Sequence, residues 1–265
     1  MKITIDHFTT YEFAKPLVSG FQQVRLTPSP SHIQDIKKWT TTFTNAREQV
    51  SYLDHHQNRV QLIQLEPGFS TFTIHASGEV LVNNLNGISP LDDSPCPNWL
   101  YLRTTRRTTP GVRTAELIQN LEARDQLSAV HDLMLRVREN LTFDPESSAT
   151  SWTAEEVLRE GYGVCQDFTH VLVAATRALN IPSRYVSGYL SMGDGTEQSA
   201  MHAWAETFID KLGWVGLDAT NGISPDEHYI RVAVGLDLDD AAPVIGCRVG
   251  GFEERLRVHI QINQQ

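Results

Sequence analysis

Residues 161–182 read GYGVCQDFTHVLVAATRALNIP, and this stretch decides the fold of the second half of the chain. Apolar side chains recur along it at helical spacing, which predicts a helix that begins at Cys165 and ends at Asn180 and Pro182. The apolar face of this helix comprises Phe168, Val171, Leu172, Ala175 and Leu179. Gly161 and Gly163 precede the cysteine and let other backbone or a substrate approach closely. The sequence thus places a cysteine at the N-terminus of a long helix.

A cysteine in this position has the surroundings that nucleophilic chemistry needs. The thiolate is the reactive form, and a helix N-terminus stabilises an anion through its unpaired amides and its dipole. A base must lie beside the sulfur, and a third group must hold that base. His202 begins a strand-like run at 202–209, and Asp218 ends another at 214–218. Because antiparallel neighbours bring the start of one strand beside the end of the next, we predict a Cys165, His202 and Asp218 triad.

The first part of the chain predicts β-structure. Short runs with alternating or β-branched residues lie at 2–6, 39–44, 59–65, 70–76 and 79–82, separated by Pro, Gly, Asn and Asp. Prolines and glycines then cluster over 86–113, and helical periodicity follows from Leu117 to Leu141. Further strand-like runs occupy 184–190, 228–234 and 255–262. We therefore expect an α+β protein with an N-terminal antiparallel β-sandwich at 1–110. A catalytic core at 111–265 would follow, with the nucleophile helix on an antiparallel sheet and the C-terminal strands included.

Four sequence motifs in the second half carry a family resemblance. They are GVCQDF at 163–168, IPSRYVSGY at 181–189, HAWAE at 202–206 and GWVGLD at 213–218. In this order they resemble the transglutaminase-like superfamily of papain-like cysteine enzymes. YEF at 11–13, RLTP at 25–28, and Asp54 with Asn58 resemble the β-rich N-terminal region that precedes this core in bacterial members.

The resemblance implies the same roles: nucleophile for Cys165, base for His202 and orienting carboxylate for Asp218. It also implies acyl transfer on amide bonds through a thioester, with peptide or amide hydrolysis expected and a peptide or protein as substrate. Transfer to an amine, as in a transglutaminase, and a non-catalytic peptide-binding module on the same fold stay open. Four residues depart from the family pattern, and they concern acceptor or substrate details: Met201, Ala219, Leu236 and Leu238.

Other features narrow the range of partners. The net charge of −10 disfavours nucleic acid and anionic membranes. Cys96 and Cys247 lie far from Cys165 without a CxxC pair, and the start of the chain lacks a signal-peptide pattern, so we expect a reducing cytoplasm. No cofactor and no metal are expected: His55 and His56 are interpreted as a solvated pair in a polar turn, and Asp167 as a helix cap. The oligomeric state is left open.

Overall fold

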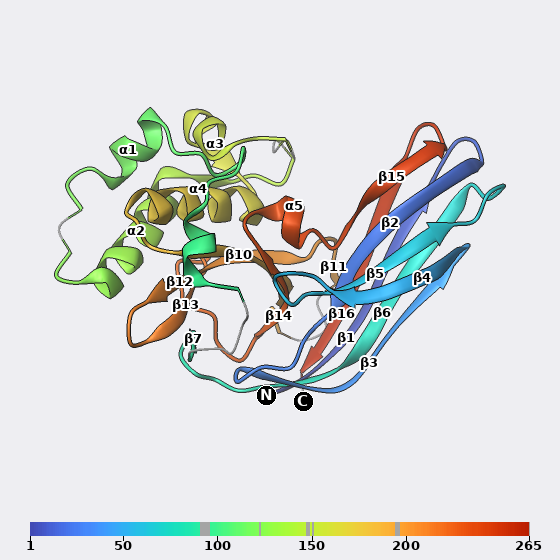
Figure 1. Cartoon of the computed structure of the whole chain (residues 1–265), viewed down its shortest axis with the longest axis horizontal. Helices are drawn as coiled ribbons and strands as arrows, with labels where there is room; N and C mark the ends of the chain where they lie inside the picture. Colours follow the sequence, from blue (N-terminus) through green and yellow to red (C-terminus); the bar gives the residue numbers. More distant parts are fainter. Residues whose placement is uncertain (91–95, 122, 147–148, 150, 194–196, 265) are drawn as a thin grey trace.

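Two antiparallel sheets pack face to face at one end of the molecule (Figure 1). The computed structural model describes residues 1–90, 96–121, 123–146, 149, 151–193 and 197–264. One sheet has the order β11 (Glu197–Gln198), β16 (Arg255–Gln264), β1 (Lys2–Glu12), β6 (Thr71–Val82) and β3 (Gln34–Thr44). The other has the order β15 (Val244–Gly250), β2 (Leu17–Thr27), β5 (Arg59–Leu65) and β4 (Ala46–Leu53).

Side chains along each strand point alternately inward and outward, and the inward ones form the core of this sandwich. Leu26 and Ile63 from one sheet pack with Phe72 and Ile74 from the other. The sequence analysis missed β2 and β4 for a physical reason. The inward side of β2 includes Gly20 and Gln22, and nearly all of β4 is exposed, so neither strand shows an apolar alternation.

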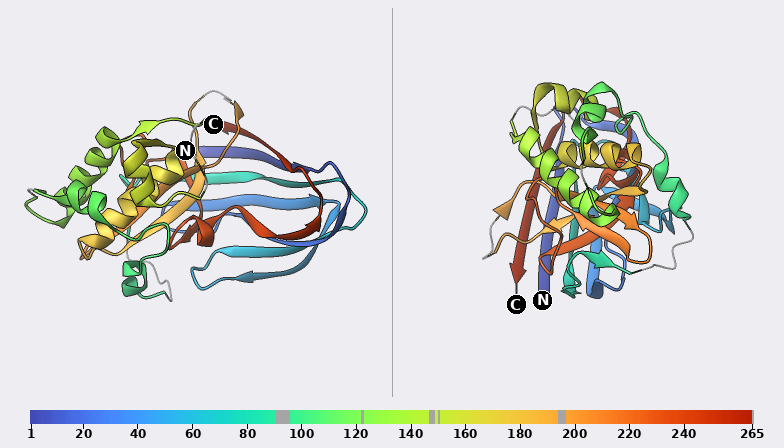
Figure 2. Two further views of the ribbon diagram at one scale, coloured as in Figure 1. Left: turned by 90° about the horizontal axis from the view of Figure 1, so that it is seen from above. Right: turned by 90° about the vertical axis from the view of Figure 1, so that its left-hand side faces the viewer.

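The last two strands of the chain complete the sandwich. β16 pairs with β1 from Ile3 against Gln264 to Glu12 against Arg255, and β15 pairs with β2. The ends of the chain therefore lie side by side, as the views from other directions also show (Figure 2). The sequence analysis grouped the run at 255–262 with the catalytic core and predicted no strand at β15, whereas both strands are hydrogen-bonded to the N-terminal sheets. A division into domains at residue 110 stays a prediction.

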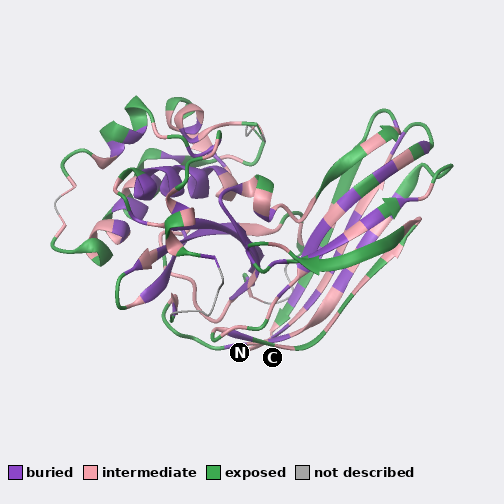
Figure 3. Ribbon diagram, in the orientation of Figure 1, coloured by how far each residue is buried: buried purple, intermediate pink, exposed green. Residues whose placement is uncertain are grey.

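The rest of the chain forms a helical layer on a third antiparallel sheet. Its order is β14 (Tyr229–Gly235), β10 (Ser183–Leu190), β12 (His202–Ile209), β13 (Gly213–Leu217) and β7 (Ile88–Ser89). Helix α4 (Cys165–Ala178) covers β10 and β12 and is buried along almost its whole length (Figure 3). Its bounds agree with the predicted helix, since Asn180 adopts a left-handed conformation and ends it.

Smaller elements surround α4. They are η1 (Asn98–Leu102), α1 (Val112–Ile118), α2 (Gln126–Asn140), α3 (Ala154–Glu160), the paired β8 (Thr142–Phe143) and β9 (Tyr162–Gly163), and α5 (Leu238–Ala241). The predicted helical region 117–141 is thus two helices, because Asn120 takes a positive φ and Asp125 caps α2. Among the described residues, none of these helices has both the length and the apolar character needed to cross a membrane. The predicted α+β architecture is confirmed.

Two amide side chains fasten the sandwich to the core sheet. Asn58 donates to the carbonyl of Val234 at 2.7 Å and accepts from its N–H at 2.8 Å. Gln34 makes the same pair of bonds with the backbone of Arg231, at 2.7 and 2.9 Å. Both amides are buried, so they substitute for a further strand along the β14 edge.

Candidate active site

Cys165 is the first residue of α4, where the chain turns from β9 into the helix. The carboxylate of Asp167 accepts the N–H of Val164 at 2.9 Å, so Asp167 caps the helix as expected. A side chain at position 163 would place its Cβ 2.7 Å from the Cβ of Asp167, which explains the need for glycine there. Because helix geometry gives the N–H of Cys165 no intrahelical acceptor, this amide can stabilise negative charge beside the sulfur.

The sulfur of Cys165 lies in a partly open, mainly apolar environment. Cys165 is half-buried and packs against a cluster that contains Tyr185, Ala203, Ala233 and Leu238. Burial raises the pKa of Tyr185 well above its ordinary value, and the nearby charges of Cys165 and Asp167 act in the same direction. Tyr185 therefore remains a neutral phenol beside the nucleophile.

His202 lies between Cys165 and Asp218. Its Nε2 is 2.6 Å from Oδ2 of Asp218, so Nδ1 is the ring nitrogen left for the hydrogen bond with Cys165. Burial of the ring opposes protonation, but the hydrogen bonds and charges of Asp218 and Cys165 outweigh it and raise the pKa of His202 to about 10. The ring therefore carries its positive charge at neutral pH, directly beside the sulfur of Cys165.

Asp218 is fully buried and accepts five hydrogen bonds. The backbone N–H groups of Thr220 and Asn221 donate to Oδ1 at 2.9 and 3.1 Å. Oδ2 accepts from His202, from the side-chain amide of Asn221 at 2.7 Å and from the hydroxyl of Tyr229 at 2.8 Å. Burial alone would raise the pKa of Asp218, but these donors and the charge of His202 lower it. The carboxylate is thus held ionised and in one orientation.

Asn221 and Tyr229 are site residues that the sequence analysis missed. Asn221 lies in the turn that follows Asp218, and the pair of Asn221 with Gly222 is a recognisable turn signal. Tyr229 lies on β14, and only the folded sheet brings it to the carboxylate.

Two family models match the chain. Residues 115–219 match the transglutaminase-like superfamily, and residues 3–81 match the bacterial transglutaminase-like N-terminal region. The first of these ranges contains Cys165, His202 and Asp218.

The chain carries a transglutaminase-like core. Uncharacterized protein ML0607 of Mycobacterium leprae is 27% identical over 283 residues, with 99% of each chain covered. Uncharacterized protein Rv2569c of Mycobacterium tuberculosis is 33% identical over 148 residues, which cover 52% of this chain and 47% of that protein. A solved structure of a candidate cysteine protease from Cytophaga hutchinsonii covers 99% of this chain and 90% of its own. It superimposes with a TM-score of 0.75 at 22% identity, a likeness of fold.

An open recess of the transglutaminase-like core is lined by two partners of Asp218, although not by the three triad residues themselves. It has a volume of about 410 Å³, and its walls include Asn221 and Tyr229, the partners of Asp218. Leu190, Met192 and Ile223 supply apolar surface, and the last two side chains are exposed.

The departures from the family pattern occupy structural positions around the core. Leu238 packs in the cluster beside Cys165, and Leu236 packs with Tyr101 and Trp214. Met201 packs against the core of the sandwich and against a second cluster that joins one sandwich sheet to β10 and β14. Ala219 is buried in the helical core. Of the four, Leu238 therefore has the most direct route to influence the nucleophile.

The other two cysteines belong to other parts of the structure. Cys96 is buried with Tyr101, and Cys247 is exposed on β15. Two groups of described residues have side chains close enough to hold a metal ion: His55, His56 and Asp240, and the consecutive residues 226–228. The expectation that His56 is solvated was wrong, because its side chain is 1% exposed.

Proposed function

We propose that Cys165, His202 and Asp218 catalyse acyl transfer from an amide through a thioester. The observation that carries this proposal is the position of His202, whose ring is hydrogen-bonded on one side to Cys165 and on the other, at 2.6 Å, to the buried carboxylate of Asp218. A thiolate, an imidazolium and an orienting acid are the parts that covalent catalysis by cysteine requires.

The first half of the reaction forms the thioester. The Cys165 thiolate attacks the amide carbonyl carbon, and the N–H of Cys165 is positioned to stabilise the resulting oxyanion. His202 gives its Nδ1 proton to the amine nitrogen as the C–N bond breaks. The amine leaves, the acyl group stays on sulfur, and His202 is left neutral, still bonded to Asp218.

The second half transfers the acyl group to an acceptor. Neutral His202 removes a proton from water, the hydroxide attacks the thioester, and the carboxylic acid leaves as the C–S bond breaks. We propose hydrolysis of peptide or protein amides as the main reaction, because the fold is that of a candidate cysteine protease along nearly the whole chain. A primary amine in place of water would give the transglutaminase outcome.

A reducing compartment suits this chemistry. Cys165 must remain a free thiol to act, and all three cysteines are free. We therefore propose a cytoplasmic setting, where disulfides rarely form.

The test is mass spectrometry of a peptide library incubated with the protein, with and without an added primary amine. New carboxyl termini in both samples support hydrolysis, whereas amine adducts that replace them support transfer. Cys165→Ala is the control, and products that persist in that variant rule out the proposal. A non-catalytic peptide-binding module would bind peptides but give no new termini in either sample.

A further inference from the structure

We propose that His55, His56 and Asp240 bind a divalent transition-metal ion of the zinc type, at a site separate from the triad. The ligand atoms of these three side chains all lie within 4.8 Å of one another. Nε2 of His56 is 3.2 Å from Oδ2 of Asp240. Two ligand atoms about 2.1 Å from a tetrahedral zinc ion are separated by about 3.4 Å, so this spacing needs little adjustment.

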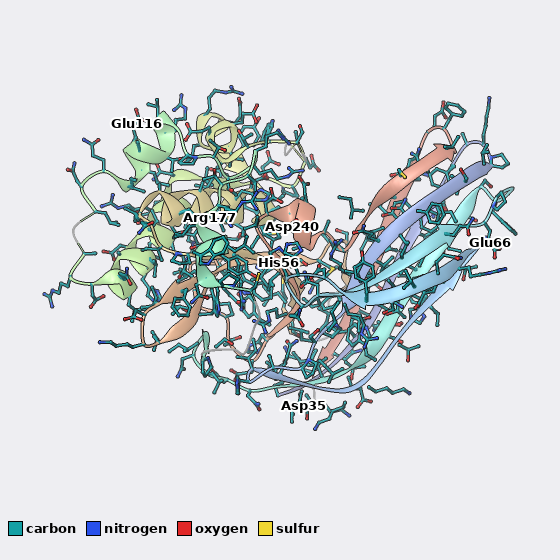
Figure 4. The ribbon with its side chains drawn as sticks, viewed as in Figure 1. Asp35, His56, Glu66, Glu116, Arg177 and Asp240 are labelled. Atoms are coloured by element: carbon teal, nitrogen blue, oxygen red, sulfur yellow. The ribbon has the colours of Figure 1, made fainter. Side chains whose placement is uncertain are left out.

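The site joins two parts of the molecule that lie far apart in the sequence. His55 and His56 belong to the turn between β4 and β5 of the sandwich, and Asp240 belongs to α5. Figure 4 labels His56 and Asp240 next to each other between the sandwich and the helical layer. A bound ion would therefore fasten the turn to α5.

Both sides of the site are held in place before any ion binds. The carboxylate of Asp54 accepts the backbone N–H groups of His56 and Asn58, each at 2.9 Å, which fixes the turn. On the other side, Oδ2 of Asp240 accepts the N–H of Leu236 at 3.0 Å. Such preorganisation lowers the entropic cost of gathering ligands.

Tyr101 orients the buried histidine. Its hydroxyl lies 2.9 Å from Nδ1 of His56, which leaves Nε2 directed at Asp240. Metal-bound histidines commonly bond their second nitrogen to such a partner. On binding, Nε2 gives its lone pair to the ion and the single ring proton resides on Nδ1, donated to Tyr101.

The chemical types of the three ligands indicate which metal ions the site would bind. Two imidazoles and one carboxylate suit Zn²⁺ and its neighbours Ni²⁺ and Cu²⁺. Ca²⁺ and Mg²⁺ prefer sites made of oxygen atoms. With three protein ligands, water would complete the coordination.

An ion bound to Asp240 would also affect the surroundings of Cys165, because α5 packs beside this cysteine. Leu238 and Ala241 of this helix pack in the cluster around Cys165. An ion that fixes α5 to the sandwich would therefore fix one wall of the thiol environment, while the triad itself needs no metal for its chemistry.

The test is titration of Zn²⁺ into the full chain carrying Cys165→Ala, with a chromophoric chelator as competitor. That substitution removes the thiol that could itself hold zinc with His202. One equivalent should bind, and adding His55→Ala should weaken binding by about tenfold or more. His55 is exposed, so this variant should fold. The matched control, His228→Ala, lies in the other cluster and should leave the affinity unchanged.

Thermal unfolding gives a second measurement on the same proteins. Zn²⁺ should raise the unfolding midpoint of the Cys165→Ala chain and have little effect when His55→Ala is added, because only the folded state assembles the site. Mg²⁺ and Ca²⁺ should not compete. Absence of zinc binding at about 100 µM free ion, or binding that is insensitive to His55→Ala, would overturn the proposal.

Discussion

At the scale of single residues, each member of the proposed triad has a different role: Cys165 is the nucleophile, His202 transfers protons and the buried Asp218 orients His202. Cys165→Ala removes the nucleophile, and His202→Ala removes both the cation and the base. We expect each to lower kcat by several orders of magnitude. Asp218→Asn should cost less, by about tenfold or more, because Asp218 orients the ring without itself transferring a proton. Steady-state kinetics on an amide substrate measures this order, and a variant at Asp218 that is the most damaging would point to a different role.

Tyr229 is the second test at this scale. Its hydroxyl donates to Asp218 from inside the sheet, so Tyr229→Phe should lower kcat by about tenfold, as expected for one buried bond to a charge. Tyr189→Phe is the matched control, since Tyr189 is equally buried but bonds to His7. Equal losses of kcat in both variants would mean that Tyr229 acts only through stability.

The raised pKa of His202 also predicts how stability depends on pH. The folded protein holds a proton on this ring up to about pH 10, whereas the unfolded chain releases it near pH 6.5. The contribution of the ring to the free energy of unfolding is therefore complete below about pH 6.5 and is lost as the pH rises toward about 10. Urea unfolding at several pH values should show this decline in the wild type relative to His202→Gln. Parallel curves would contradict it.

At the scale of elements, α4 brings the thiol to a helix N-terminus beside an imidazolium. Iodoacetamide near pH 6.5 should therefore modify Cys165 faster than the other thiols. Cys247 is the informative comparison, because it is exposed on a strand without such neighbours, while Cys96 is buried. Peptide mapping after brief labelling measures the ratio. Faster modification of Cys247 would contradict an activated Cys165.

Comparison of the predicted with the observed helices and strands shows which of them the sequence could predict. Helix α4 was predicted from its apolar periodicity, and the runs of β10, β12 and β13, which are buried almost throughout, were predicted close to their observed bounds. Helix α3 was missed although Thr153 and Glu156 form a capping box that the sequence displays. The two histidines at 55 and 56 were misread, because the partners of His56 lie 45 and 184 residues away.

At the scale of the whole molecule, the buried side chain of Asn58 connects the sandwich to the core sheet, because it bonds both backbone groups of Val234. Asn58→Ala would leave both backbone groups of Val234 without a partner, so it should lower the free energy of unfolding by about 2 kcal/mol or more. The neighbouring Gln57→Ala should change it little, since that side chain is exposed. Urea unfolding compares the two, and equal effects would deny Asn58 this role.

The pairing of the first strands with the last has a consequence for folding during synthesis. β1 has β16 as one of its two neighbours, and β2 has β15, so each N-terminal sheet lacks a strand until about 240 residues later. Until the ribosome has released Val244–Gln264, one edge of β1 and one edge of β2 stay open to other chains. The transglutaminase-like core, made mostly from intervening sequence, can acquire its helices in that interval. The nascent sandwich therefore cannot close these two edges until β15 and β16 have been synthesised.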